Sequence, residues 1–447
     1  MYIFPIGNCE TSSQLPIQIL LFYHYLIKTP CKNSCFFLLD STNQAVYPLN
    51  RHKIENLFAT YFTIYFFGGF FHMKVVIAID SLKGSLSSIE AGMAIKEGVL
   101  RAKPDARIVV KPLADGGEGT TDALIEGMNG ERIDLTVTGP MHAPVNAYYG
   151  YLKDSNTAVM EMASAAGITL VPDDTKDPLL ATSYGVGEMI NHALQKGCRN
   201  FIIGIGGSAT NDGGIGMLKA LGARFFDENG MDAGEGGQAL AKVSRIDISG
   251  LNPLLREAHI QVACDVNNPL CGENGSTYVY GPQKGVTENQ KKQLDEAMAH
   301  FAQITSKTLG TDYCNTPGAG AAGGLGFAFL SYLGAALTPG IELILNAVGL
   351  EQELSDADVV VTGEGRLDFQ TAMGKAPVGV AKLAKKHHAK VIAFAGSVTK
   401  EAAACNKEGI DAFFPILRNI CTLAEAMDSA TAKANMTATA EQVFRLL

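Results

Sequence analysis

The sequence lacks several features that would place it at once in a well-marked class of proteins. Its nine cysteines include no CxxC pair and follow no regular spacing. This excludes a disulfide framework and a zinc site, and it favours a reduced, cytosolic setting. Positive charge is not in excess, because the formal net charge is −9. That balance argues against nucleic acid or an anionic membrane as the main partner.

A Walker A sequence, GxxxxGK[ST], is also absent. Gly374, Lys375 and Ala376 come nearest, but they lack both the hydroxyl and the upstream glycine. Any phosphate group must therefore be held in another way, by the amides of glycine turns, by lysines or by Mg²⁺.

The composition that is present is typical of a well-packed α/β protein. Of the 447 residues, 47% are hydrophobic and 18% are charged, and 48 are glycines. Such a length suggests two or three domains, and the apolar content is far too high for a disordered chain.

The first 72 residues differ from the rest of the chain. They contain 16 of the 35 Phe and Tyr residues but only two alanines, Ala45 and Ala59. No helical or alternating period persists in them. The apolar stretch at 15–27 is short for a membrane span, and no Lys or Arg precedes Lys28, so a secretory signal is missing.

We hypothesise that residues 1–72 are a disordered extension or are not part of the native protein, and that translation starts at Met73. Gly68 and Gly69 can be encoded by GGAGGA, a ribosome-binding sequence, a few codons before Met73. A regular strand, residues 75–79, begins directly afterwards. The alternative is a genuine membrane-seeking N-terminal extension.

Residues 201–216, FIIGIGGSATNDGGIG, are the most informative stretch. An apolar run predicts a buried strand, the glycines that follow predict a turn, and helical spacing resumes at Gly216. A strand, a glycine turn and a helix N-terminus together form an anion site, because unpaired N–H groups and the helix dipole face the turn. We expect this loop to wrap a phosphate and Asp212 to hold Mg²⁺. The alternative is a tight connection whose glycines only permit close packing.

Strands and helices alternate from Met73 onward. Residues 75–79, 108–110, 359–361 and 391–395 predict strands, and 88–103 and 377–388 predict helices. The pattern predicts an α/β fold with a doubly wound parallel sheet, made by residues 73–132 and 340–447. The tail, 423–447, is predicted to be a surface helix pair.

The pattern changes in residues 133–339, which predict an inserted second α/β domain. Residues 133–137, 145–151 and 157–162 predict antiparallel strands around turns that contain Gly139 and Pro140. A helix near 183–196, the stretch 201–216, a strand at 260–263 and a helix at 288–309 complete this domain.

Polar residues follow many of the predicted strands. Because ligands on such sheets bind beyond the carboxyl ends of the strands, residues 80–85, 115–120 and 362–368 are expected at one edge. Arg366 is suited to clamp a carboxylate or a phosphate with two hydrogen bonds. The alternative for Arg366 is a surface ion pair, and for Glu364 and Asp368 it is a helix-entry charge.

Two other functions stay open at this point. Residues 204–209 fit GxGxxA after a strand, and Asp227 lies at about the distance of a ribose-binding acid, so an NAD(P)-dependent dehydrogenase of a small hydroxy acid is one alternative. The GxGxxG at 318–323 follows Thr316 and Pro317 rather than a strand. The second alternative is a non-catalytic regulator that binds a small acid.

Seven motifs, in order, resemble those of the bacterial glycerate kinases. They run from residue 78 to residue 371, and none lies in residues 1–72. The motifs are AIDSLKGSLSS (78–88), PLADGGEGT (112–120), IGGSATNDGGIGML (205–218), ACDVNNPLCG (263–272), GPQKG (281–285), PGAGAAGGLG (317–326) and VTGEGRLDFQT (361–371).

The resemblance implies ATP-dependent phosphorylation of D-glycerate in the cytosol, in glyoxylate and sugar-acid catabolism. D-glycerate and ATP are then the partners, without nucleic acid or membrane, and Mg²⁺ accompanies the ATP. The 2-phosphate is the favoured product and the 3-phosphate the alternative. A homo-oligomer is compatible with the resemblance, which also implies two α/β domains, one of them flavodoxin-like and split by the other.

Phosphoryl transfer requires positioning, charge neutralisation and an acceptor for the hydroxyl proton. We assign catalysis to Asp212, Asp368, Arg366 and Lys83, and metal binding to Asp212 and Asp265; which acid is the base is left open. Binding of substrate and nucleotide is assigned to residues of the same motifs, namely Asp80, Ser81, Asp115, Gly116, Gly117, Glu118, Gly206, Gly207, Ser208, Thr210, Asn211, Asn267, Gly320, Gly323 and Glu364.

Overall fold

The chain divides into two units, residues 1–72 and residues 73–447. A computed structural model describes residues 2–5, 36–39, 45–49, 72–114, 117 and 119–447. The first unit contains a small sheet in which the middle strand pairs in parallel with the first and antiparallel with the third: β1 (Tyr2–Pro5), β2 (Phe36–Leu39) and β3 (Ala45–Leu49). The apolar stretch at 15–27 lies outside the described residues.

The second unit contains a five-stranded parallel sheet. Its spatial order is β16-β15-β14-β4-β5. Numbered along the chain, that order is 2-1-3-4-5 read from the β5 edge, which is the flavodoxin order. The predicted flavodoxin-like sheet is therefore confirmed, and its strands are β4 (Lys74–Ile79), β5 (Arg107–Pro112), β14 (Val359–Leu367), β15 (Lys390–Val398) and β16 (Ala412–Pro415).

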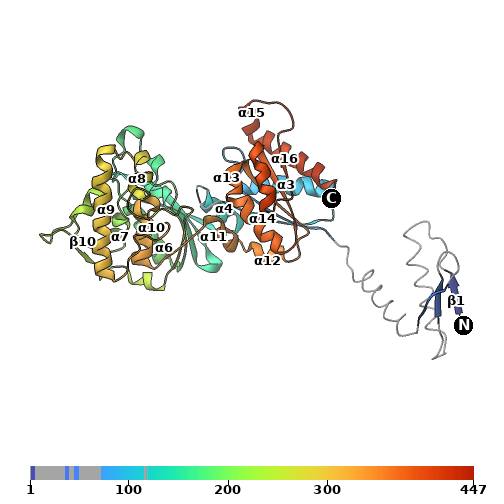
Figure 1. Ribbon diagram of the computed structural model, residues 1–447, viewed down its shortest axis with the longest axis horizontal. Coiled ribbons are helices and arrows are strands. Elements are labelled where there is room, and N and C mark those ends of the chain that lie inside the picture. The colour runs from blue at the N-terminus through green and yellow to red at the C-terminus, as the bar shows by residue number, and fades with distance from the viewer. Residues whose placement is uncertain (1, 6–35, 40–44, 50–71, 115–116, 118) are drawn as a thin grey trace. The chain divides into compact units, whose positions relative to one another are not determined.

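Helices cover both faces of this sheet (Figure 1). Alternate residues of β4 enter two different hydrophobic clusters. Val75, Ile77 and Ile79 pack with α3 (Ser88–Ala102) and α16 (Ser429–Phe444). Val76 and Ala78 belong to the cluster on the other face, with α11 (Gly340–Ala347), α12 (Leu350–Leu354) and α14 (Ala376–Lys386). Burial on both faces explains the uninterrupted apolar sequence of the strand.

A second sheet has six strands in the order β13-β12-β9-β8-β7-β6. The pairs β6–β7 and β7–β8 are antiparallel, as the sequence predicts, and the other pairs are parallel. The strands are β6 (Glu131–Thr138), β7 (Pro144–Leu152), β8 (Thr157–Glu161), β9 (Asn200–Gly204), β12 (His259–Ala263) and β13 (Ala336–Thr338).

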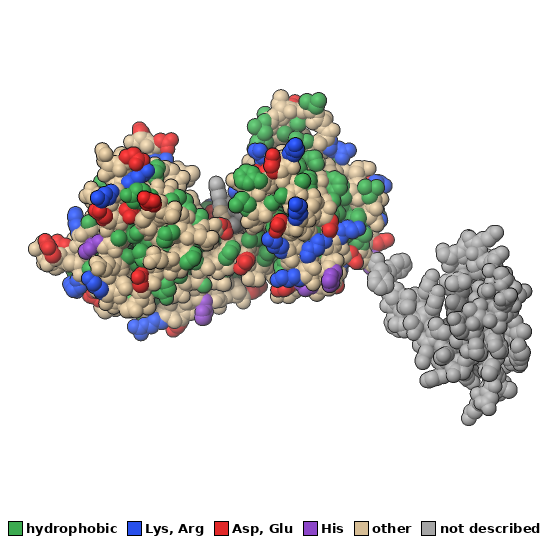
Figure 2. Space-filling view, viewed as in Figure 1, with side chains coloured by type: hydrophobic (Ala, Val, Ile, Leu, Met, Phe, Trp, Pro, Cys, Tyr) green, Lys and Arg blue, Asp and Glu red, His purple; other side chains and the backbone are tan. Residues whose placement is uncertain are grey.

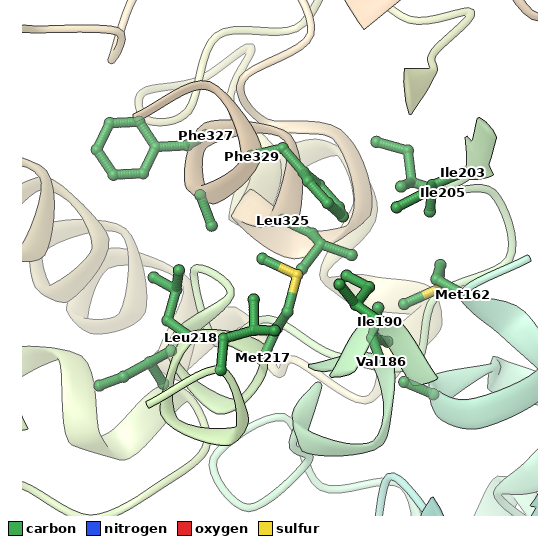
Figure 3. Close-up of a cluster of buried hydrophobic side chains, with 14 of the residues drawn as sticks. Met162, Val186, Ile190, Ile203, Ile205, Met217, Leu218, Leu325, Phe327 and Phe329 are labelled. Atoms are coloured by element: carbon green, nitrogen blue, oxygen red, sulfur yellow. The ribbon is translucent and has the colours of Figure 1, made fainter. Parts of the chain in front are cut away.

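The largest hydrophobic cluster of this sheet contains side chains from β8, β9 and the neighbouring helices, and Figure 3 shows part of it. Its apolar side chains include Ile190, Met217 and Leu325, which lie close together in the figure. The helices that supply this core are α6 (Tyr184–Lys196), α7 (Ile215–Ala220), α9 (Glu288–Leu309) and α10 (Ala321–Leu333). The opposite face contributes Val159 and Ile202 to the cluster that contains α11, so the two sheets share a core.

Two secondary-structure predictions need correction. Strand β14 does not end at residue 361 but continues to Leu367, paired with β15 along its length, so Glu364 and Arg366 are strand residues. The tail does form two helices, α15 (Leu423–Met427) and α16, but only α15 is a surface helix, because α16 packs on α3 and its Met436, Ala440 and Phe444 are buried.

The surface shown in Figure 2 carries basic and acidic side chains interspersed with one another. Within the described parts of the chain, no helix combines the length and the apolar character that crossing a membrane requires.

Candidate functional site

Two cavities lie beside the carboxyl ends of parallel strands, one at each of the two large sheets. The first, cavity 1, has a volume of about 440 Å³ and belongs to the flavodoxin-like sheet. It lies where β4, β14, β15 and β16 end. Its lining residues are Asp80, Ser81, Leu82, Lys83, Ser85, Glu364, Gly365, Arg366, Asp368, Lys375, Gly396, Ser397, Ile416, Leu417, Leu423, Ala426 and Met427.

Three carboxylates line cavity 1, and each is held by a neighbouring group. Asp80 is buried and its Oδ1 accepts a hydrogen bond from the Ser81 amide at 2.6 Å. Glu364 Oε1 accepts a hydrogen bond from Thr371 Oγ1 at 2.5 Å. Asp368 is the N-cap of α13 (Phe369–Ala372), and its Oδ1 accepts from the Gln370 amide at 2.9 Å. These bonds fix the orientation of the carboxylates at the cavity.

Three cations line the same cavity: Lys83, Arg366 and Lys375. Arg366 Nε lies 3.8 Å from Asp368 Oδ2, and the Arg366 side chain is 66% exposed. An ion pair this exposed contributes little to stability, so the guanidinium keeps donors for a ligand. Lys375, which the sequence-based assignment omitted, lies at the N-cap of α14.

Cavity 2 has a volume of about 240 Å³ and belongs to the six-stranded sheet. The glycine turn after β9 and the loop after β12 form much of its wall. Its lining residues are Gly117, Ile205, Gly206, Gly207, Ser208, Ala263, Cys264, Asp265, Val266, Tyr280, Gln283, Lys284, Ala321 and Ala322. Gly117 comes from the loop after β5, so that the flavodoxin-like sheet contributes to this cavity. Glu161 accepts a hydrogen bond from the Thr121 amide in the first turn of α4 (Thr120–Gly127), next to that loop.

Asp212 does not line either cavity. It is completely buried, and its carboxylate accepts four hydrogen bonds: from Ser183 N and Oγ, each at 2.8 Å, from Gly214 N at 3.0 Å and from Gly216 N at 3.3 Å. Burial raises the pKa of this carboxyl, whereas the four bonds lower it. The strand, turn and short helix α7 do place amides around an anion, but this anion is the Asp212 carboxylate of the same loop rather than a ligand phosphate.

Asn211 also supports the glycine loop, through a side-chain hydrogen bond. Asn211 Nδ2 donates to Thr277 Oγ1 at 3.1 Å, and both Asn211 and Thr210 are fully buried. Gly323 has φ +72°, and a Cβ there would lie 1.9 Å from the Thr210 carbonyl oxygen. Gly320 similarly approaches Pro269, where a Cβ would lie 2.2 Å from the carbonyl oxygen. The GAGAAGGLG motif is therefore glycine-rich because its backbone lies in direct contact with the backbone at Thr210 and at Pro269, which leaves no room for a Cβ.

Lys284 is the residue of cavity 2 that the sequence-based assignment missed. Its side chain is buried, with the residue 2% exposed, and Nζ donates to Ser208 Oγ at 2.6 Å and to the Thr210 carbonyl at 2.8 Å. Burial lowers the pKa of this ammonium group to about 7. The signal in the sequence was the GPQKG motif itself, whose Pro282–Lys284 form a short 3₁₀ helix in the structure.

The structure thus groups the predicted residues into three sets. Cavity 1 brings together Asp80, Ser81, Lys83, Glu364, Arg366 and Asp368, and cavity 2 brings together Gly117, Gly206, Gly207, Ser208 and Asp265. Asp212, Thr210, Asn211, Asn267, Gly320 and Gly323 do not line either cavity. Asp115, Gly116 and Glu118 lie outside the described residues.

The dehydrogenase alternative requires Asp227 to bind a ribose, but this carboxylate accepts hydrogen bonds within its own turn. Asp227 Oδ1 accepts hydrogen bonds from the amides of Asn229 and Met231, at 2.9 and 2.8 Å, within an exposed turn. It therefore shapes a turn of its own loop, and it is not among the residues lining either cavity.

Metal-binding capacity is limited to small sets of oxygen ligands. In the part of the chain that the structure describes, no group of three or more His, Cys, Asp or Glu side chains is placed to hold a metal ion. Asp265 lines cavity 2, and its Oδ1 accepts from the Gly340 amide at 2.9 Å. One or two carboxylates combined with phosphate oxygens are the usual environment of Mg²⁺, and the acids of cavity 1 match that chemistry.

Comparisons with known proteins agree on one family. The model of the glycerate kinase family matches residues 75–447. The chain is 50% identical over 358 residues to glycerate 2-kinase of Escherichia coli, covering 80% of this chain and 94% of that protein. It is 49% identical over 358 residues to glycerate kinase of Bacillus subtilis, with the same coverage. A crystal structure from Salmonella typhimurium LT2, provisionally described as glycerate kinase 2, matches with a TM-score of 0.78 and 47% identity, covering 83% of this chain and 97% of that one.

Proposed function

The chain belongs to the glycerate kinase family, and from this premise we propose that it transfers the γ-phosphate of ATP to a hydroxyl of D-glycerate. The observation that carries the proposal is cavity 1, where three carboxylates and three cations meet at the carboxyl edge of a flavodoxin-like sheet. Phosphoryl transfer requires both kinds of charge, because cations stabilise the migrating phosphate and a carboxylate accepts the hydroxyl proton.

Cavity 1 is proposed to take the nucleotide. Its lining contains the apolar side chains Ile416, Leu417, Leu423, Ala426 and Met427 in addition to the charged groups. A flat base can pack on these apolar side chains while the phosphates reach Lys83, Arg366 and Lys375. Arg366 is the residue of this set that can hold two phosphate oxygens at once.

Asp368 is proposed as the proton acceptor, because its carboxylate is fixed by the Gln370 amide and lies beside Arg366. Asp80 and Glu364 would hold Mg²⁺ together with the phosphate oxygens. The ion, when bound, supplies neutralisation of the charge on the phosphates. These roles replace the earlier assignment of Asp212, whose buried carboxylate is already saturated by donors.

The 2-phosphate is the proposed product, and the 3-phosphate is the alternative. The similarity to glycerate 2-kinase of Escherichia coli supports this choice. The cytoplasm is the proposed location, and the described cysteines, all of which are free thiols, are consistent with it.

The decisive experiment is an assay with ATP, Mg²⁺ and D-glycerate, followed by proton-coupled ³¹P NMR of the product. A phosphate on the C2 oxygen has one proton on the adjacent carbon and gives a doublet, whereas a phosphate on the C3 oxygen has two and gives a triplet. Asp368→Asn is expected to lower kcat by about 100-fold or more. Asp154→Asn, which changes an exposed acid, is the matched control. ATP consumption that does not depend on glycerate would contradict the proposal.

A further inference from the structure

Cavity 2 contains a buried cation that the chemistry of cavity 1 does not use. The ammonium group of Lys284 has three N–H donors, and two of them are directed to Ser208 Oγ and to the Thr210 carbonyl. Of the carboxylates in the described parts of the chain, none lies within the 4.0 Å ion-pair distance of this nitrogen. Both hydrogen-bond partners are neutral oxygens, so no carboxylate pairs with the ammonium group by direct contact.

A buried lysine without an acid partner is costly, because the ammonium loses its hydration. A purely structural tether between the GPQKG turn and the glycine loop would not require a charge. A lysine is explained better by an anion that enters the cavity, displaces water and pairs with the ammonium group.

We propose that cavity 2 binds an anionic oxygen group of a substrate, with the Lys284 ammonium as its cationic contact and the Ser208 hydroxyl beside it. This inference rests on the proposed function, since the candidate groups are the carboxylate of glycerate and a phosphate of ATP. Both are anionic oxygen groups and make the same contact with an ammonium donor. The smaller volume of this cavity, about 240 Å³ against about 440 Å³, favours the carboxylate of glycerate.

The charged and titratable groups around Lys284 are few. Asp212, behind the glycine loop, is the acid whose charge favours the protonated lysine, and it is itself fully buried. Asp265, Cys264 and Tyr280 share the cavity lining. Asp265 accepts a hydrogen bond from the Gly340 amide, and Tyr280 donates to Asn268 Oδ1 at 2.6 Å.

Anion binding has a consequence for protonation. Since burial lowers the pKa of Lys284 to about 7, the free protein at pH 8 holds this side chain mostly neutral. An anion in contact with Nζ favours the charged form and raises the pKa again. Binding of a fully ionised anion at pH 8 should therefore take up protons from solution.

The test is calorimetric titration of the full chain at pH 8 in several buffers of different ionisation enthalpy, from which proton uptake is obtained. Sulfate, D-glycerate and a non-hydrolysable ATP analogue are titrated separately, because neither sulfate nor the glycerate carboxylate titrates near this pH. Lys284→Met is compared with the wild type. Lys292→Met, which replaces a lysine whose side chain is 81% exposed on α9, is the matched control.

We expect net proton uptake in the wild type and in Lys292→Met, and its loss in Lys284→Met together with at least a tenfold loss of affinity. Loss confined to D-glycerate assigns the site to the carboxylate, and loss confined to the ATP analogue assigns it to a phosphate. If Lys284→Met folds and binds all three ligands like the wild type, the inference is wrong. If Lys284→Met does not fold, Ser208→Ala, which removes the hydroxyl beside Nζ, is titrated instead, and unchanged affinity of this variant for sulfate and D-glycerate overturns the inference.

Failure of this inference is distinguishable from failure of the proposed function. Unchanged kcat and KM for D-glycerate in Lys284→Met, with normal phosphorylation, would remove only the role of Lys284. Absence of glycerate phosphorylation in the wild type would remove the proposed function, and the sulfate titration would still decide whether Lys284 binds an anion.

Discussion

At the scale of single residues, Asp212 and Lys284 illustrate how burial separates structural from functional charge. Both are buried, but Asp212 is saturated by four donors, whereas the partners of Lys284 are two neutral oxygens. A buried charge whose hydrogen bonds are complete has no capacity left for a ligand. A buried charge that faces a cavity with only neutral partners does have that capacity, which is why the anion site is assigned to Lys284.

Asp212→Asn should therefore reduce stability. The amide group must place N–H donors against the amides or hydroxyl that now donate to the carboxylate, and one unsatisfied buried donor costs about 1–3 kcal/mol. The shift is measured as the midpoint of urea unfolding, with Asp154→Asn as the exposed control. An unchanged midpoint combined with a strong loss of turnover would return Asp212 to the list of catalytic residues.

Arg366→Lys should be damaging although it conserves charge. Lysine offers a point charge and cannot bind two oxygens in one plane, so we expect kcat/KM to fall by about 10- to 100-fold. A rise in KM alone would indicate a contact to the bound ground state, and a parallel fall in kcat would indicate a contact to the migrating phosphate. Arg256→Lys, at an exposed position, is the control. If Arg366→Lys equals the wild type in both constants, Arg366 is a surface ion pair with Asp368.

At the scale of secondary-structure elements, the C-terminal helix shows how tertiary contact changes the meaning of a sequence. Helix α16 packs against α3, and Thr437 Oγ1 donates to the Ala94 carbonyl at 3.1 Å, across 343 residues of sequence. The apolar residues of α16 are spaced on one face, but many are alanines, so that the periodicity is weak. Close packing of two small-residue faces is what buries this helix.

Gly98→Ala tests this packing. A Cβ at Gly98 would lie 2.3 Å from the Thr437 carbonyl oxygen and 2.8 Å from Ala440 Cβ, so α16 must move away. We expect a loss of about 1–3 kcal/mol in the free energy of unfolding. On an exposed helix the same substitution would gain about 1 kcal/mol. Urea unfolding shows whether Gly98→Ala lowers or raises the free energy of unfolding. The neighbouring Glu97→Ala is the control at a half-exposed position. A more stable Gly98→Ala protein would contradict the packing of α16 on α3.

At the scale of the whole molecule, both cavities are formed by residues 80–427, and their described lining comes from two sheets that share a hydrophobic cluster. The family match spans residues 75–447. The division into an extension (1–72), a flavodoxin-like domain (73–132 with 340–447) and an inserted domain (133–339) remains our proposal. Gly117, from the loop after β5 of the first sheet, lines cavity 2, so the first sheet contributes to both cavities.

Removal of residues 1–72 should leave fold and activity unchanged. Every described lining residue of the two cavities, and the strand β4 that begins the larger unit, lies after this segment. The shortened chain, beginning at Met73, is compared with the full chain by urea unfolding and by kcat with D-glycerate. A shortened chain that is insoluble, or that unfolds at a clearly lower urea concentration, would show that the segment contributes to the core.

The sequence by itself determined the order of strands and helices, the doubly wound α/β class and the edge of the sheet at which polar residues gather. These features depend on local patterns and on the rule that the carboxyl ends of parallel strands share an edge, so neighbouring residues carry the information. Asp80, Glu364, Arg366 and Asp368 were predictable for this reason. Only the tertiary structure decided which charges face a cavity. The Asp212 carboxylate accepts a hydrogen bond from Ser183, 29 residues away in the sequence, and the Lys284 ammonium group donates to Ser208, 76 residues away. The direction of a side chain depends on the partners that packing brings to it, and those partners are not encoded in the residues beside it.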